Sequence, residues 1–228
     1  MFTEIELNKI FNILKIFSII NENGGFMNKF WQIVDTARLA AAASFLIGLG
    51  NFALLKLGEP IGPVLFSLGL LGVCVMGLNL FTGKCGFLIE DKLSIVQLII
   101  ILVVNLLFGY AIGVVFALMD ESIVPAAGAK VASWGISWGY FLKSVMCGAI
   151  MYIAVELYRR GTKLGILIGV PLFIFCGFQH SIANAITMGV AMEFNPALFV
   201  CVAGNFVGAI AAWGLCRTEK NKMAIMAK

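Results

Sequence analysis

Long apolar runs recur along the chain, separated by short polar or charged segments. A helix needs about 20 mainly apolar residues to cross the hydrocarbon core of a bilayer. The following segments meet that requirement: about Val34–Leu57, Ile61–Phe81, Leu93–Met119, Tyr140–Leu157, Leu164–Val190 and Pro196–Cys216. The pattern therefore predicts an all-α integral membrane protein with six transmembrane helices. They form one membrane domain, residues 29–217, which leaves no room for a soluble catalytic domain.

The segment before the first span has a different pattern. Polar residues recur at intervals of four, four and three: Glu4, Asn8, Asn12 and Lys15. Apolar residues lie between them at helical spacing: Leu7, Phe11, Leu14 and Phe17. This is typical of an amphipathic helix on a membrane surface. We expect that helix within residues 1–28, with a break at the glycine-containing stretch Asn21–Gly25.

Positive charge is unequally divided between the two sides of the predicted bundle. Most lysines and arginines fall near the termini, after span two, after span four and after span six. By the positive-inside rule, both termini are cytoplasmic, including a basic tail at residues 218–228, in a multi-pass protein of the cell (inner) membrane. The longest connection, about Asp120–Gly139, lies on the opposite side. We interpret Val124–Gly128 within it as a turn.

Composition agrees with the span pattern and narrows the chemistry. Hydrophobic residues make up 61% of the chain and charged residues 12%, with a mean hydropathy of +1.00. A soluble domain carries about a quarter charged residues. The chain has one histidine and six scattered cysteines without a CxxC pair, so we expect cysteines that pack as small apolar residues, no metal site and no cofactor.

Spans two and five are each interrupted by polar and glycine residues. The interruptions are Asn79–Lys84 and Gly177–Ala185, and the second contains His180. Three spans followed by three of opposite orientation, with matching breaks, form the inverted 3+3 repeat of many transporters, in which broken helices meet near the midplane. Spans three and six each carry a G-x-x-x-G motif, which we interpret as helix-packing glycines: Gly109 and Gly113, and Gly204 and Gly208.

The breaks supply what a small anion needs inside a membrane. Thr82, His180 and Asn184 offer hydrogen-bond donors, and half-helix N-termini offer positive potential. Burial favours the neutral imidazole, so we expect His180 to be uncharged until an anion arrives and favours its protonation. A structural histidine bonded to a neighbouring helix is the alternative. Lys143, near the outer end of span four, either draws anions into a vestibule or reaches the lipid headgroups.

The polar motifs resemble those of the formate/nitrite transporter family. The strings are Leu80-Phe81-Thr82-Gly83, Gly177-Phe178-x-His180-Ser181-Ile182-Ala183-Asn184 and Gly204-Asn205-x-x-Gly208. The resemblance implies an aquaporin-like fold, a homopentamer with one pore per protomer, and a chamber where Thr82 faces His180. It implies an outer constriction at Phe66, Leu70 and Phe173, and an inner constriction at Leu80, Phe81 and Val155.

Neighbouring positions depart from the family pattern. Gln179 stands where many members have glutamate, Tyr152 where formate channels have asparagine, and Lys143 resembles the lysine of the nitrite and hydrosulfide branches. These side chains belong to the expected substrate pathway and bear on which anion uses it. Tyr110 replaces an asparagine in span three.

The resemblance implies a channel or proton-coupled transporter, not an enzyme. Its substrates would be small monovalent anions of weak acids: formate and nitrite first, and then hydrosulfide. The expected partners are the anion, a proton where transport is proton-coupled, the lipid bilayer and identical subunits, with no nucleic acid. Two alternatives remain: an aquaporin-type pore for neutral solutes, or a non-transporting membrane subunit of a complex. Neither break carries the aquaporin Asn-Pro-Ala motif, and one histidine is too few for a bis-histidine haem.

Overall fold

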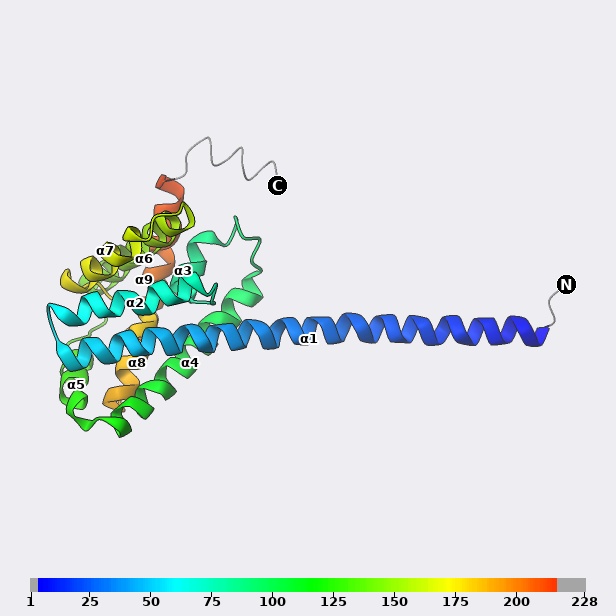
Figure 1. The fold of residues 1–228 in the computed structure, drawn as a ribbon, viewed down its shortest axis with the longest axis horizontal. Coiled ribbons are helices and arrows are strands. Elements are labelled where there is room, and N and C mark those ends of the chain that lie inside the picture. The colour runs from blue at the N-terminus through cyan, green and yellow to red at the C-terminus, as the bar shows by residue number, and fades with distance from the viewer. Residues whose placement is uncertain (1–3, 217–228) are drawn as a thin grey trace.

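The protein is all-helical over the residues that the structure describes. The computed structural model describes the backbone of residues 4–216 and the side chains of residues 27–216. Figure 1 shows a bundle of helices from which the N-terminal part of the first helix projects as a long straight rod. No strand occurs among the described residues. The predicted basic tail, 218–228, and the side chains of the predicted amphipathic segment lie outside the described residues.

Helix α1, Glu4–Leu57, joins the predicted N-terminal segment to the first span without interruption. The break expected at Asn21–Gly25 is therefore wrong. A glycine inside a helix costs only about 1 kcal/mol relative to alanine, so glycine alone does not force a helix to end. At the other end of α1, Lys56 donates a hydrogen bond to Asp120 (Nζ–Oδ2 2.6 Å), which lowers the pKa of that carboxyl to about 2.

The second and fifth apolar segments are each divided into two helices, as predicted. The breaks do not extend over the whole of the predicted Asn79–Lys84 and Gly177–Ala185, because Phe81–Lys84 and Ser181–Ala185 are helical. The second consists of α2, Ile61–Val75, and the short α3, Phe81–Lys84, which leads into the 3-10 helix η1, Cys85–Phe87. The fifth consists of α7, Leu164–Phe175, and α8, Ser181–Ala191. Leu80 and His180, the last residues of the two breaks, have extended backbone and are buried.

Two glycines at equivalent positions cause these divisions. Gly77 (φ 65°) and Gly177 (φ 66°) adopt the left-handed conformation that glycine tolerates best. The amide that follows each glycine then bonds to a carbonyl five residues earlier, Leu78 to Val73 and Phe178 to Phe173, both at 2.9 Å. This is the Schellman pattern that ends helices. The two apolar runs therefore break at the same relative position.

The remaining helices are long. Within the described part of the chain, the helices long and apolar enough to cross a membrane are Met27–Leu57 of α1, α4 (Ile95–Met119), α6 (Trp138–Arg159) and α9 (Ala197–Cys216). Ser94 and Gln97 form a capping box that starts α4. Large apolar side chains point outward from the bundle; Leu107 is 68% exposed and Leu118 is 74% exposed. Such a surface suits contact with lipid or with other subunits.

The connection between α4 and α6 is more ordered than expected. It contains the 3-10 helix η2, Glu121–Ile123, and helix α5, Val124–Ala132, so the predicted turn at Val124–Gly128 is wrong. Pro125 lies in the first turn of α5, where its missing N–H leaves no hydrogen bond unmade. Helix α5 packs against α8 and brings Lys130 to one mouth of the bundle.

Close helix contacts confirm the interpretation of the G-x-x-x-G glycines as packing residues. A Cβ added to Gly113 of α4 would overlap the backbone carbonyl of Ile186 in α8. A Cβ added to Gly208 of α9 would overlap the carbonyl of Val145 in α6. These glycines let α4 contact α8, and α9 contact α6, backbone to backbone.

Candidate functional site

The two helix breaks meet at a hydrogen bond between Thr82 and His180. Thr82 Oγ1 lies 2.9 Å from His180 Nε2, and both side chains are buried. Thr82 belongs to α3 just after the first break, and His180 is the last residue of the second break. The structure thus brings together the two side chains that the sequence predicted to share a chamber.

The second ring nitrogen of His180 fixes the tautomer. His180 Nδ1 accepts a hydrogen bond from the backbone N–H of Ala183 at 3.1 Å, which caps the N-terminus of α8. A nitrogen that accepts carries no proton, so the proton of the neutral ring is on Nε2. Nε2–H therefore donates to Thr82 Oγ1, and the threonine hydroxyl proton remains available to another acceptor. Protonating Nδ1 would require release of the Ala183 cap.

Asn205 of α9 holds the second break in place. Its Oδ1 accepts from the Ser181 backbone N–H at 2.8 Å, and its Nδ2 donates to the carbonyls of Gln179 and Ser144, each at 2.8 Å. The Asn205 side chain is fully buried. The residues on both sides of His180 are thus tied to one amide, which fixes the direction of the imidazole.

Asn105 of α4 holds the first break in the same way. Its Oδ1 accepts from the Phe81 backbone N–H at 2.8 Å, and its Nδ2 donates to the carbonyls of Asn79 (3.2 Å) and Ala40 (2.7 Å). Sequence reasoning missed this residue and looked instead to Tyr110, where the family has an asparagine. Asn105 is a polar residue inside an apolar helix, and it lies 100 positions before Asn205. Gly77 and Gly177 are the same distance apart, so this spacing was the signal that could have identified Asn105.

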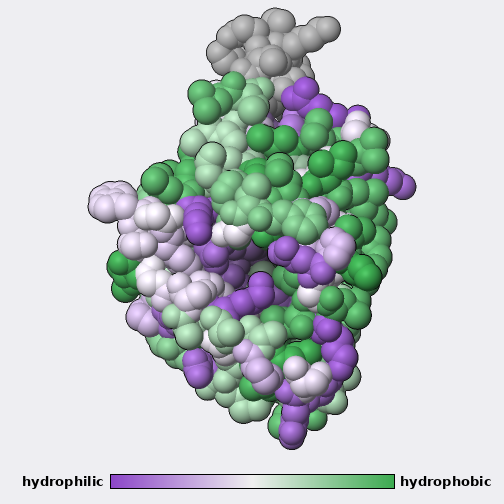
Figure 2. Space-filling view, turned by 90° about the vertical axis from the view of Figure 1, so that its left-hand side faces the viewer, coloured by the Kyte–Doolittle hydropathy of each residue, from purple (hydrophilic) through white to green (hydrophobic). Residues whose placement is uncertain are grey.

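A cavity of about 170 Å³ lies on one side of the Thr82–His180 pair. Among its lining residues are Phe66, Phe173, Gln179, His180, Asn184 and Lys130; we call it the Lys130 vestibule. Figure 2 looks onto the end of the molecule where α1 ends and α5 lies, and shows a hollow with hydrophilic residues around it. The Phe66 and Phe173 rings meet edge to face, with centroids 6.0 Å apart, and the Phe173 ring stacks on His180 at 5.7 Å.

Asn184 and Gln179 form a polar wall in this vestibule. Asn184 Nδ2 donates to Gln179 Oε1 and to the Tyr140 hydroxyl, both at 3.0 Å. The amide protons of Asn184 are therefore directed to protein acceptors, which makes it a support for Gln179 as much as a donor to an anion. Asn51 and Thr187 extend the wall, with Asn51 Nδ2 donating to Thr187 Oγ1 at 3.1 Å.

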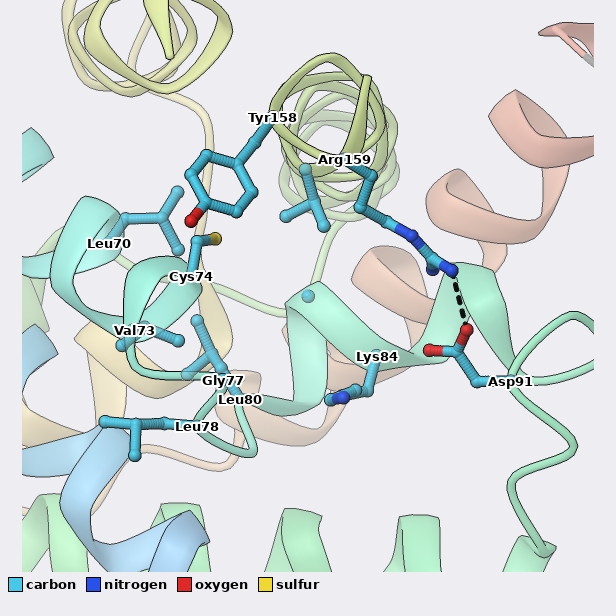
Figure 3. A pocket seen from close by; sticks show the side chains of 12 residues that line it. Leu70, Val73, Cys74, Gly77, Leu78, Leu80, Lys84, Asp91, Tyr158 and Arg159 are labelled. Atoms are coloured by element: carbon cyan, nitrogen blue, oxygen red, sulfur yellow. Dashed lines mark hydrogen bonds and ion pairs between the residues drawn. The ribbon is translucent and has the colours of Figure 1, made fainter. Parts of the chain in front are cut away.

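Figure 3 shows a second cavity, of about 180 Å³, whose lining shares no residue with that of the Lys130 vestibule. We call it the Lys84 vestibule; Leu80 and Val155, two of the residues predicted for the inner constriction, line it. Leu70 also lines it, although it was expected to join Phe66 and Phe173 on the opposite side. Leu70 lies one helical turn beyond Phe66 along α2, a rise of about 6 Å toward the break.

Besides Thr82, three of the predicted pathway residues line neither vestibule. Tyr152 is buried against Phe87, with ring centroids 4.8 Å apart. Phe81 is buried beside Asn105, and the Lys143 side chain is exposed on α6. Lys130 of α5, which the sequence did not single out, lines the vestibule that was one of the two alternatives for Lys143, the other being the lipid headgroups.

Comparisons with known proteins place this geometry in a recognised fold. No family model matches the sequence. A pentameric formate channel, solved with formate bound, superposes with a TM-score of 0.66 over 86% of this chain and 98% of that channel, at 19% identity. The fold is that of a formate channel. An ion channel of the FNT family also superposes, with a TM-score of 0.60 over 88% of this chain and 92% of that channel, at 21% identity.

The formate-channel fold confirms the resemblance read from the motifs, as far as the fold is concerned. In sequence, the chain is 25% identical over 191 residues to an uncharacterized transporter, YrhG, of Bacillus subtilis (strain 168), covering 70% of this chain and 71% of that protein. Each of these three proteins is described as a channel or a transporter. With its apolar helices, this chain is a multi-pass membrane protein.

The site can bind a small ion through hydrogen bonds and electrostatic attraction. Among the described residues, no group of three histidine, cysteine or carboxylate side chains could hold a metal ion. What the arrangement provides is a buried, hydrogen-bonded Thr82–His180 pair, with bulky apolar side chains and one lysine in the lining of each vestibule. Such a site can exchange the hydration of a small ion for fixed donors.

Proposed function

We propose that the protein conducts small monovalent anions of weak acids across the membrane, with formate first and nitrite and hydrosulfide next. The observation that carries the proposal is the buried Thr82–His180 pair at the junction of two broken helices. An isolated charge in hydrocarbon costs tens of kcal/mol by Born estimates, so an anion can cross only where polar groups replace its water. Polar side chains inside membrane segments are themselves rare, and they mark ion pathways. The formate-bound neighbour of the same fold supports formate as the leading candidate.

The proposed pathway runs from one vestibule to the other. An anion collects near Lys130, passes the Phe66–Phe173 pair and reaches Thr82 and His180. It then leaves past Leu80 and Val155 into the Lys84 vestibule. The bulky apolar side chains exclude hydrated ions and close by dewetting, so selection depends on whether the donors replace the lost water.

At the centre, His180 acts as a neutral donor that orients Thr82. Because Nε2–H donates to Thr82 Oγ1, the Thr82 hydroxyl can turn its proton to the anion. Proton coupling through His180 requires a proton on Nδ1, and therefore release of the Ala183 cap. We propose channel-like conduction while the cap is made, and proton transfer to the anion only when it opens.

The assembly that fits this proposal is a homopentamer with one pore per protomer. The similar formate channel is pentameric. We also propose the inverted 3+3 repeat of six spans, location in the inner membrane and cytoplasmic termini. Equivalent hydrogen bonds at Asn105 and Asn205, and equivalent left-handed glycines at Gly77 and Gly177, support the repeat.

The test is flux into liposomes that contain the purified protein. Initial rates are measured for formate, nitrite, hydrosulfide and chloride, with and without a pH gradient, in wild type and in His180→Ala. We expect weak-acid anions to pass, chloride to be excluded and His180→Ala to lose most of the flux. No flux of any weak-acid anion would overturn the channel proposal. Wild-type flux in a well-folded His180→Ala protein would overturn the role of His180.

A further inference from the structure

We propose that the Lys84 vestibule contains a second binding site for a small monovalent anion, held by Lys84. The inference rests on the proposed function, because the ligand is an anion of the same class that has passed Leu80 and Val155. The cavity is separate from the Thr82–His180 pair: neither of those residues lines it. Its polar groups come from three elements, which supply Lys84, Asp91, Tyr158 and Arg159.

The charged side chains that line this vestibule, Lys84, Asp91 and Arg159, carry a net charge of +1. Arg159 Nη2 lies 2.8 Å from Asp91 Oδ1, and Figure 3 shows this ion pair within the cavity wall. The Arg159 guanidinium also lies over the Phe87 ring, with Cζ 4.2 Å from the ring centre, and this cation–π contact further fixes its position. Lys84 has no ion pair with any described residue, and no interaction joins it to the pair in Figure 3. The Arg159–Asp91 pair is neutral overall, so Lys84 sets the net charge of +1.

The cavity has room for a small anion, and its walls are largely apolar. Its volume is about 180 Å³, and apolar side chains, Leu70, Val73, Leu80 and Val155, form much of its lining. An ammonium group beside apolar walls is poorly screened, which strengthens its attraction for an anion. A single uncompensated charge suits a monovalent anion better than a polyvalent one. The anion that leaves the Leu80–Val155 constriction thus meets a charged partner before it reaches bulk water.

The position of Lys84 also connects this site to the central pair. Lys84 lies two residues after Thr82, in the same four-residue helix α3. Thr82 points to His180, whereas Lys84 lines the vestibule. An anion held at Lys84 therefore lies beside the helix that carries Thr82, the next donor of the pathway, as multi-site conduction requires.

A cysteine in the vestibule wall provides a direct probe. Cys74 lines the cavity, and it can be compared in a background where the exposed Cys176 and Cys216 are replaced by serine. We would measure the rates at which Cys74 reacts with two methanethiosulfonates, one carrying a sulfonate and one a quaternary ammonium. The ratio of the anionic to the cationic rate reports the local potential. Lys84→Met should lower that ratio on the order of 5-fold, the effect of one unit charge several ångströms away.

The matched control is Lys163→Met, which removes the same charge from an exposed lysine outside the cavity. It should leave the ratio unchanged, and Lys84→Arg should restore it. Formate should slow the sulfonate reaction in wild type but not in Lys84→Met. An unchanged ratio in Lys84→Met, no protection by formate in wild type, or no reaction with either reagent would each overturn the site. Formate flux is measured on the same samples: flux without protection refutes this site alone, whereas absent flux refutes the proposed function.

Discussion

Asn105 and Asn205 make the same hydrogen bonds to the two helix breaks. Each side-chain Oδ1 accepts, at 2.8 Å, the backbone N–H of a residue 24 positions earlier, Phe81 or Ser181. Each Nδ2 donates to a carbonyl 26 positions earlier, at Asn79 or Gln179. The amides thus replace the helical hydrogen bonds that the breaks give up, and they position Leu80 and His180 between them.

We predict that removing either amide damages the central site more than it damages the bundle. Asn205→Ala leaves the Ser181 N–H without a partner, at a cost of about 1–3 kcal/mol for a buried group, and leaves the Gln179 carbonyl with the weak Cys201 S–H donor alone. Thermal unfolding in detergent should shift downward, and formate flux should fall further than the loss of folded protein explains. Asn105→Ala should behave alike.

Asn28→Ala is the control for these variants, because Asn28 is exposed on α1. It should change stability by less than about 0.5 kcal/mol and leave flux intact. If Asn205→Ala matched this control in both measurements, the two amides would not be the supports of the breaks.

A second prediction concerns helix contact at α9. Gly208→Ala places a methyl group against the Val145 carbonyl, a backbone atom that cannot move away cheaply. We expect strong destabilisation, by about 3 kcal/mol or more, or loss of folded protein, seen as a lower midpoint in thermal unfolding. Gly214→Ala lies on the same helix with nothing within 4 Å, and it should be neutral or slightly stabilising. Equal behaviour of the two variants would contradict the packing role.

A third prediction concerns the aromatic pair at the Lys130 vestibule. Phe173→Leu removes the ring that meets Phe66 and stacks on His180, so the constriction should widen while the position stays apolar. Acetate should then enter liposomes at a rate closer to that of formate. Phe175→Leu on the same helix is the control, because Phe175 is 50% exposed and lines neither vestibule. If the ratio of the acetate rate to the formate rate were the same in Phe173→Leu and Phe175→Leu, the Phe66–Phe173 pair would not set the size limit.

The sequence was sufficient for features that depend on local chemistry. Apolar run lengths predicted the long apolar helices, and clusters of glycine and polar residues predicted that the second and fifth segments are divided, because Gly77 and Gly177 end helices through their own backbone conformation. The same reasoning failed at Asn21–Gly25, where α1 continues. A glycine only weakens a helix, and whether the helix ends depends on the rest of the fold.

Features that depend on which way a side chain faces could not be predicted. Lys143 and Lys130 are both lysines near the same end of the bundle, but only Lys130 lines the vestibule, because α5 is a helix that packs on α8. Leu70 and Phe66 share α2, yet one turn separates them into different cavities. Asn105 was missed because its role is defined by acceptors 26 and 65 residues away.

The most direct test of the central site is the initial formate flux of Thr82→Val in liposomes, with Thr82→Ser as its companion. Valine keeps the shape of threonine and removes only the hydroxyl that accepts from His180 Nε2 and faces the passing anion. Loss of one such hydrogen bond, worth about 1.4 kcal/mol, predicts a flux about tenfold lower, whereas Thr82→Ser should stay near wild type. Wild-type flux in a folded Thr82→Val protein would contradict the account.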